Sequence, residues 1–223
     1  MFILLLSCTI VPEESKEEKL AKASTKVIFA SIEPLGSHVF RSKVRRKEYR
    51  GEKELSSHDE IVEIMWQDWD NFQYTRTIDT KEVSALIVHN HIPWLRSYNK
   101  PWKKYEDAEP YRVQMRSAWN TWEQYLGTYE EQLSWRILET TERDGRPVTR
   151  YEITLDTTKI TQKKNLNLSS LSGSVTVDTA TAVRLYTELE MVLSSENYKK
   201  EIDIQLQRSD IGNVLEITPP SNN

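Results

Sequence analysis

The chain has 223 residues, a formal net charge of −4 and a single cysteine. This length suits one domain with a sizeable core, and one cysteine excludes both an internal disulfide framework and a cysteine-rich zinc site. Because glycine is scarce and the basic residues are spread along the chain, glycine-rich phosphate loops and a nucleic-acid partner are also excluded.

The N-terminus combines an apolar run, Phe2 to Leu6, with Ser7 and the only cysteine, Cys8. This arrangement resembles a bacterial lipobox, which implies cleavage after Ser7 and lipidation of Cys8. Acyl chains on Cys8 would anchor the protein to a membrane. In lipoproteins, an aspartate directly after the lipidated cysteine favours retention in the inner membrane. This chain has Thr9 at that position, which favours a location in the outer membrane, facing the periplasm. The alternative is an apolar N-terminal strand, because the run is shorter than the core of an ordinary signal peptide.

We expect four segments. Residues 1–7 are a signal remnant, 8–19 are a lipidated tether, 20–218 are a single domain and 219–223 are a disordered tail. The tether is strongly polar, as a spacer between membrane and domain must be. Residues 20–32 predict a short helix that ends before Pro34 and Gly36.

Strands follow from Val39 onward, where apolar and polar residues alternate with a period of two. The pattern predicts strands around 39–45, 62–66, 72–75 and 82–89, and the basic side chains of the first strand are expected on a solvated face. A long connection containing Pro93 and Pro101 follows, over 90–109.

One long helix is predicted over 110–126. Pro110 suits its first turn and Gly127 its end. Its apolar stripe is rich in tryptophan and recurs at i, i+3, i+4 and i+7, which is the spacing of one buried helix face.

The chain then returns to strands, around 133–137, 151–155, 175–177, 183–193 and 202–206. Asp144-Gly145 predicts a hairpin between the first two. Each strand is apolar on one side only, as in an antiparallel sheet with one buried face. The fold class is therefore α+β: a curled antiparallel sheet of about 8–10 strands, an open half-barrel, with the tryptophan-rich helix and the short N-terminal helix on its concave side.

The segment Gly173-Ser174-Val175-Thr176-Val177-Asp178-Thr179-Ala180-Thr181-Ala182 resembles a strand-turn-strand motif of the lipoprotein-carrier superfamily, the LolA and LolB half-barrels and related acyl-binding lipoproteins of bacterial envelopes. The family pattern has glycine where this chain has Ala182. The resemblance covers the layout of most of the chain and implies a cavity for acyl chains.

Two groups of residues are candidates for ligand binding. On the helix, Met115, Trp119, Trp122 and Tyr125 would form one wall of an apolar cavity, and in the alternative they are ordinary core. In the long connection, Trp94 and Trp102 alternate with cations, which suits a membrane interface or an anionic headgroup. Their alternative is a loop that packs on itself at the sheet rim.

Support for catalysis is thin. His89 and His91 could lie together at a strand end, but no third metal ligand has a recognisable spacing. We therefore expect no catalytic residue, metal or cofactor. The predicted function is an envelope lipoprotein that binds or carries a lipid or acylated ligand. The alternative is a structural lipoprotein with a filled core that docks an envelope protein.

Overall fold

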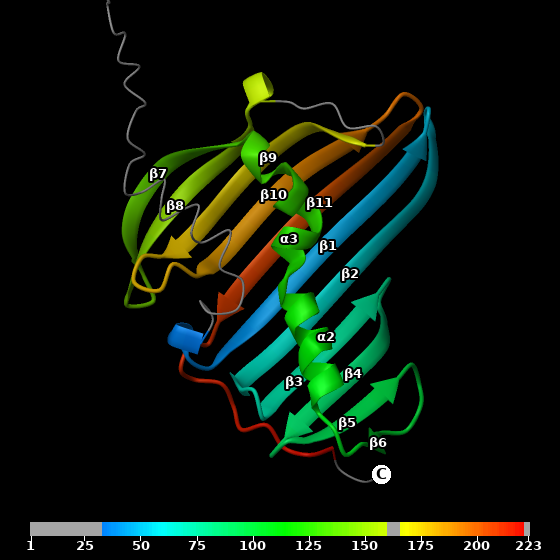
Figure 1. Cartoon of the computed structure of the whole chain (residues 1–223), viewed down its shortest axis with the longest axis vertical. Helices are drawn as coiled ribbons and strands as arrows, with labels where there is room; N and C mark the ends of the chain where they lie inside the picture. Colours follow the sequence, from blue (N-terminus) through cyan, green and yellow to red (C-terminus); the bar gives the residue numbers. More distant parts are fainter. Residues whose placement is uncertain (1–32, 160–165, 221–223) are drawn as a thin grey trace, which may run out of the picture.

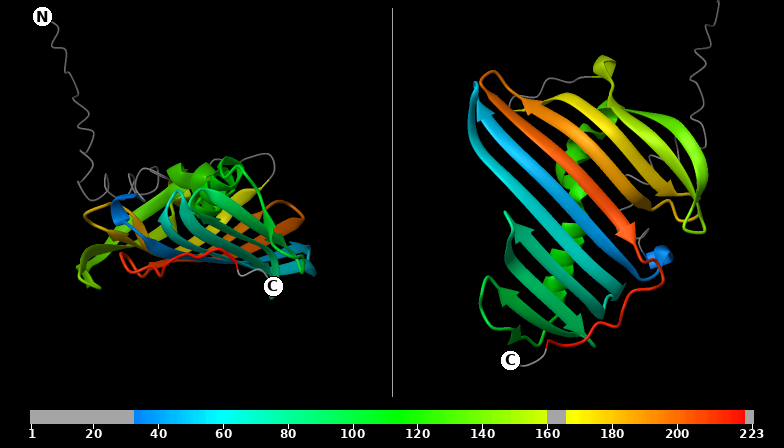
Figure 2. Two further views of the ribbon diagram at one scale, coloured as in Figure 1. Left: turned by 90° about the horizontal axis from the view of Figure 1, so that it is seen from below. Right: turned by 180° about the vertical axis from the view of Figure 1, so that it is seen from behind.

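The computed structural model describes residues 33–159 and 166–220. Four predicted features lie outside the described residues: the signal remnant 1–7, the tether 8–19 with Cys8, the helix over 20–32, and residues 221–223 of the tail. Within them, a single eleven-stranded antiparallel sheet has the order β6-β5-β4-β3-β2-β1-β11-β10-β9-β8-β7. The sheet is open, because β6 and β7 are edges, and it curves around the helices on one face (Figures 1 and 2).

Five strands form the first half of the sheet from β1 outward, and a two-residue strand ends it. They are β1 (His38–Arg50), β2 (Lys53–Asp68), β3 (Asn71–Ile78), β4 (Lys81–His89), β5 (Ile92–Ser97) and β6 (Lys103–Lys104). The other half contains β7 (Leu133–Arg143), β8 (Arg146–Leu155), β9 (Asn167–Asp178), β10 (Arg184–Ser194) and β11 (Tyr198–Ser209). The two halves join where β1 pairs with β11 in an unbroken antiparallel register.

Period-two alternation gives the sheet its two faces. On β1, Phe40 and Val44 are buried on the concave side, whereas Arg41 and Arg45 are exposed on the convex side. The convex cations pair across the strands, for example Arg45 with Asp59 at 2.9 Å. No helix of the described residues covers this convex face (Figure 2, right).

The predicted helix is divided in two. Helix α2 (Glu109–Trp119) and helix α3 (Thr121–Leu126) meet at Asn120 and are followed by the 3₁₀ segment η2 (Gly127–Gln132). The break has a local cause: the Asn120 N–H donates to the Ser117 carbonyl, a bond that tightens the last turn of α2. Both helices cross the concave face diagonally (Figure 1).

The connection predicted over 90–109 contains β5 and β6, which raises the strand number above the expected 8–10. Strand β6 pairs only with Trp94 and Leu95, so β5 is almost an edge strand. Pro93 is therefore tolerated there, since an edge strand does not need every backbone donor.

The C-terminal segment after β11 runs past the ends of β1 to β4 (Figures 1 and 2). Gln67 Nε2 donates a hydrogen bond to the Leu215 carbonyl, and Ile217 is buried. This segment therefore packs on the end of the sheet rather than extending away from it. Two short 3₁₀ segments, η1 (Glu33–Leu35) and η3 (Thr157–Lys159), complete the described elements.

Candidate functional site

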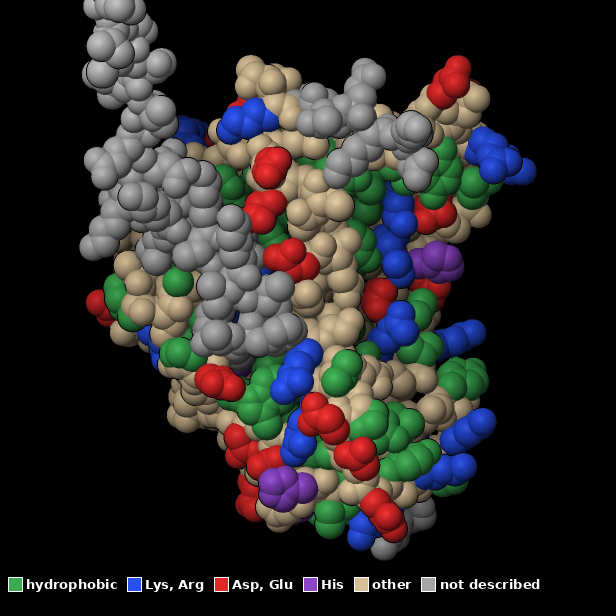
Figure 3. All heavy atoms as spheres, in the orientation of Figure 1, with side chains coloured by type: hydrophobic (Ala, Val, Ile, Leu, Met, Phe, Trp, Pro, Cys, Tyr) green, Lys and Arg blue, Asp and Glu red, His purple; other side chains and the backbone are tan. Residues whose placement is uncertain are grey.

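A groove of about 420 Å³ lies beside the helices, between α2 and α3 and the concave face of β1, β2 and β3. It is visible in the space-filling view as a hollow with basic side chains along it (Figure 3). Its apolar lining comes from both the sheet and the helices: Val44, Val62, Tyr74, Val113, Ala118 and Tyr125. Ser42 and Thr121, joined by a hydrogen bond of 3.3 Å between their hydroxyls, line the groove where α3 begins.

The groove carries an ionic cluster on its strand side. The Glu60 carboxylate accepts hydrogen bonds from Arg46 at 2.9 Å and from Arg76 at 2.7 Å. The hydrogen bond to Glu60 raises the pKa of Arg76 above its ordinary value, against the opposing effect of partial burial. Two guanidinium groups thus share one carboxylate, and the cluster has a net positive charge.

Two of the lining residues are tyrosines, Tyr74 and Tyr125. Burial raises the pKa of both Tyr74 and Tyr125, so both phenols are neutral at pH 7. A neutral phenol offers an apolar ring face together with a hydroxyl that can donate a hydrogen bond. The groove is therefore amphiphilic: apolar along the helices and positively charged at Arg46 and Arg76.

The structure separates the four helix residues predicted as a cavity wall. Tyr125 lines the groove. Met115, Trp119 and Trp122 instead lie in the main hydrophobic core, each exposing 3% of its surface or less. Their role in binding an acyl chain stays a prediction; they belong to the same hydrophobic cluster as side chains of the sheet, among them Phe40 and Leu206.

Trp94 and Trp102 lie elsewhere, at the β5 and β6 end of the sheet. The Lys104 ammonium lies 5.9 Å from the Trp94 ring centroid, and the Arg96 guanidinium lies 4.7 Å from that of Trp102. Arg96 also pairs with Glu82 at 2.9 Å. The alternation of aromatic and basic residues thus produces cation–π pairs at the sheet edge. A role of these two tryptophans in ligand binding stays a prediction.

His89 and His91 do not share partners. His91 Nδ1 lies 2.7 Å from the Asp70 carboxylate, beside Arg112. His89 Nε2 lies 2.9 Å from the side-chain amide of Asn90. Within residues 33–159 and 166–220, no cluster of three or more histidine, cysteine or acidic side chains has the spacing of a metal site.

Sequence reasoning missed the three ionic residues of the groove. The basic side chains of β1 were expected on a solvated face, yet Arg46 points inward. Its parity shows this: it is two residues from Val44 and four from Ser42, both of which face the helices. Glu60 and Arg76 likewise share the parity of Val62 and Tyr74. A strict count of alternation could have located all three.

Comparison with known proteins finds solved structures only, since no family model and no curated protein matches. The chain is similar to LprF from Mycobacterium bovis, with 16% identity, a TM-score of 0.38, and 92% of this chain and 96% of that chain covered. It is also similar to lipoprotein LppX of Mycobacterium tuberculosis, with 12% identity, a TM-score of 0.38, and 92% of this chain and 100% of that chain covered. A third similar structure is a LolA superfamily protein of Nitrosomonas europaea, with 7% identity, a TM-score of 0.27, and 87% of this chain and 94% of that chain covered. The matches thus include the superfamily that the 173–182 segment resembles.

None of the described helices is both long and apolar enough to cross a membrane.

Proposed function

We propose that this protein is a non-catalytic envelope lipoprotein that binds or carries a lipid or acylated ligand, and that the groove beside α2 and α3 receives it. The Arg46–Glu60–Arg76 cluster selects ligands whose polar end is anionic. Anchoring through Cys8 would hold the groove close to a membrane, where such ligands reside.

The observation that carries the proposal is the pairing of an apolar lining with a net positive cluster in one groove of about 420 Å³. That volume falls in the range of small-molecule sites, which are mostly apolar with a few placed polar groups. A hydrocarbon chain gains roughly 0.8 kcal/mol for each methylene that it buries, so a short stretch of chain in the groove already contributes several kcal/mol. The charged cluster then sets the orientation.

The rival function is a structural lipoprotein with a filled core that docks a protein partner. Two observations favour it: Met115, Trp119 and Trp122 are packed in the core, and the edge strand β7 exposes 42% of both Ile137 and Leu138. An unpaired, partly apolar edge strand can pair with a strand of another chain. The two functions differ in what fills the groove.

Blocking the groove distinguishes them. Val113 lines the groove from α2 and is 55% exposed, so V113W should occupy the groove without disturbing the core. We expect the variant to bind a fluorescent single-chain fatty acid at least ~10-fold more weakly than the unaltered chain, the equivalent of about 1.4 kcal/mol. The measurement is a fluorescence titration of the purified full chain, with native mass spectrometry to detect co-purified lipid.

The matched control is L138W, which places the same ring on β7, outside the groove. It should bind the fatty acid as the unaltered chain does. Equal affinity in the unaltered chain, V113W and L138W would contradict the groove as the ligand site. Absence of binding in all three would favour the rival function.

A further inference from the structure

A second group of side chains, separate from the groove, has buried hydrogen-bond donors without acceptors. It lies where β10 begins and β11 ends. Arg184 Nη1, Arg208 Nε and Thr187 Oγ1 each have almost no exposed surface and no hydrogen-bond partner within the described residues. Trp122 Nε1, on α3 and in contact with Arg184, is in the same condition. None of these residues lines the groove beside the helices.

Arg184 is the most unusual of them. It is 91% buried, and its guanidinium lies 4.5 Å from the Trp122 ring centroid. No carboxylate of the described residues forms an ion pair with it, although arginine presents five N–H donors. A buried charge without a hydrogen-bonded counter-charge is strongly unfavourable, and natural proteins rarely leave one in that state.

Arg208 adds a second cation beside it. Its Nη1 donates a hydrogen bond to the backbone carbonyl of Arg184, and its guanidinium stacks 4.9 Å from the Phe40 ring centroid. Burial lowers the pKa of Arg184 to about 9 and that of Arg208 to about 10, so both are still cations at neutral pH. The carboxylates of Glu123 and Glu130 raise the pKa of Arg184 and so oppose part of the effect of burial.

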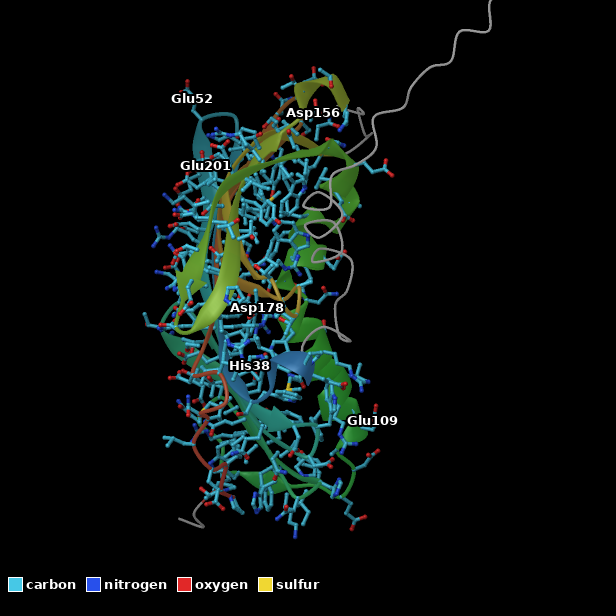
Figure 4. All side chains as sticks on the ribbon, turned by 90° about the vertical axis from the view of Figure 1, so that its left-hand side faces the viewer. His38, Glu52, Glu109, Asp156, Asp178 and Glu201 are labelled. Carbon is cyan, nitrogen blue, oxygen red and sulfur yellow. The ribbon has the colours of Figure 1, made fainter. Side chains whose placement is uncertain are left out.

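A surface crevice reaches Arg208, and Arg184, which does not line the crevice, is joined to Arg208 by the hydrogen bond to its backbone carbonyl. A crevice of about 370 Å³ opens at the ends of β10 and β11, next to the β7–β8 turn, and Arg208 is part of its lining. Arg143 and Arg146 also line it, against the acidic Asp144 and Asp210. Arg146 pairs with Asp178 at 2.9 Å, whereas Arg143 lies 5.9 Å from the Tyr186 ring centroid and 3.9 Å from Asp144. In Figure 4, the labels of Asp178 and His38, near the middle of the molecule's length, show where this region lies.

The geometry points to a phosphate-binding site: we infer that Arg184 and Arg208 bind the phosphate group of a ligand that enters through the crevice at the ends of β10 and β11. A phosphate monoester has three acceptor oxygens and a charge near −2, which matches two cations better than a carboxylate does. Guanidinium groups bind phosphate oxygens bidentately, and stacking of Arg184 on Trp122 holds one of them in place. The site is independent of the groove and of the function proposed for it.

The test uses the purified full chain with three probes: inorganic phosphate, dodecyl phosphate and the uncharged dodecyl maltoside. Binding is followed by isothermal titration calorimetry and by the shift in midpoint temperature. The key variant is R184M, which keeps the length of the side chain and removes the charge. We expect R184M to bind the phosphate probe at least ~10-fold more weakly, because a hydrogen bond to a charged group is lost.

Stability without ligand separates a binding site from a structural role. If Arg184 awaits a ligand, R184M should melt at or above the temperature of the unaltered chain, since an unpaired buried charge has been replaced by an apolar side chain. R184K, which keeps the charge and loses the planar fork, should retain part of the phosphate response. V113W, which blocks the groove, should retain all of the response to inorganic phosphate and the part of the dodecyl phosphate response that R184M loses.

The outcomes are distinct. A response to inorganic phosphate alone identifies a free phosphate ligand, and a response only to dodecyl phosphate that R184M loses and V113W keeps identifies a lipid headgroup; both support the site. The inference is overturned if no phosphate probe binds the unaltered chain, if R184M binds it equally well, or if dodecyl maltoside gives the same response. It is also overturned if R184M melts far below the unaltered chain without ligand, because Arg184 would then be structural.

Discussion

His38 is a fully buried histidine and the first residue of β1. Its Nδ1 donates to the Gly36 carbonyl at 2.8 Å, and its ring stacks on Trp119 with centroids 5.6 Å apart. Burial, and secondly the positive charge of Arg208, lowers the pKa of His38 to about 4, while the Gly36 hydrogen bond opposes the shift. His38 is therefore neutral at physiological pH, and its role is to join the end of β1 to the aromatic core.

This histidine should make the protein sensitive to acid. Its pKa is about 4 in the folded state and 6.5 as its ordinary value. Between these values the unfolded chain binds the proton and the folded chain does not, so stability is lost as the pH falls from 6.5 to 4. The full difference corresponds to roughly 3 kcal/mol. We expect H38Q to lose less stability than the unaltered chain over this interval, measured by urea unfolding at several pH values.

The control is H58Q. This variant removes a half-exposed histidine, hydrogen-bonded to Asp79 at 2.9 Å at the other end of β2, and leaves the buried His38 in place. If H38Q and the unaltered chain had parallel stability profiles between pH 6.5 and 4, the burial of a neutral His38 would not be the cause.

Among the elements, the turn between β9 and β10 differs at one position from the strand-turn-strand motif that residues 173–182 resemble. The Asp178 carboxylate is fully buried and accepts hydrogen bonds from the backbone of Ala180 and Thr181 and from Arg146. Burial would raise the pKa of Asp178, but these hydrogen bonds outweigh it and the pKa is lowered. The turn closes with Ala182 at a φ of +59°, in the left-handed region that glycine adopts readily. The glycine of the family pattern thus has a physical reason.

A182G should stabilise the protein by about 1 kcal/mol, because a side chain with a Cβ is strained at this φ and glycine is not. The gain is limited by the greater freedom of glycine in the unfolded chain. The midpoint of urea unfolding measures it. In A180G the replaced residue has no positive φ; this control should be neutral or slightly destabilising, and equal effects of A180G and A182G would contradict the argument.

At the scale of the whole molecule, the sheet is a trough with two helices lying in it (Figure 2). Its central core is continuous across both halves, from Leu86 on β4 to Ile153 on β8, with Trp122 among the largest fully buried side chains. Of the two predictions for Trp122, cavity wall or core, this burial favours core. The open space lies beside the helices and at the strand ends.

W122A should therefore destabilise the protein by about 3–5 kcal/mol, the effect of removing a large aromatic side chain from a packed interior. Thermal and urea unfolding measure it, with Y98A as the exposed aromatic control, since Tyr98 exposes 51% of its surface. If W122A melted close to the unaltered chain and lost bound lipid, Trp122 would instead be part of a ligand cavity.

The sequence by itself determined the architecture to a large extent. Alternation of apolar and polar residues with a period of two identified nine strands and their buried faces. The apolar stripe over 110–126 identified the helical layer. Both predictions are possible because an element that is buried on one side has apolar residues at regular intervals in the sequence. The additional strands β5 and β6 were hidden by prolines and by cations. The break at Asn120 depends on one local hydrogen bond, which has no periodic pattern.

Only the tertiary structure decided where ligands could be bound. Arg46, Glu60 and Arg76 are close together because of the register of three strands, and Arg184 meets Arg208 because the β10 and β11 ends coincide under Trp122. The same composition could have produced solvated charges at all five positions. Sequence patterns report which side of an element is buried, whereas a binding site depends on which buried side chains from distant elements meet, and that is set by pairing and packing.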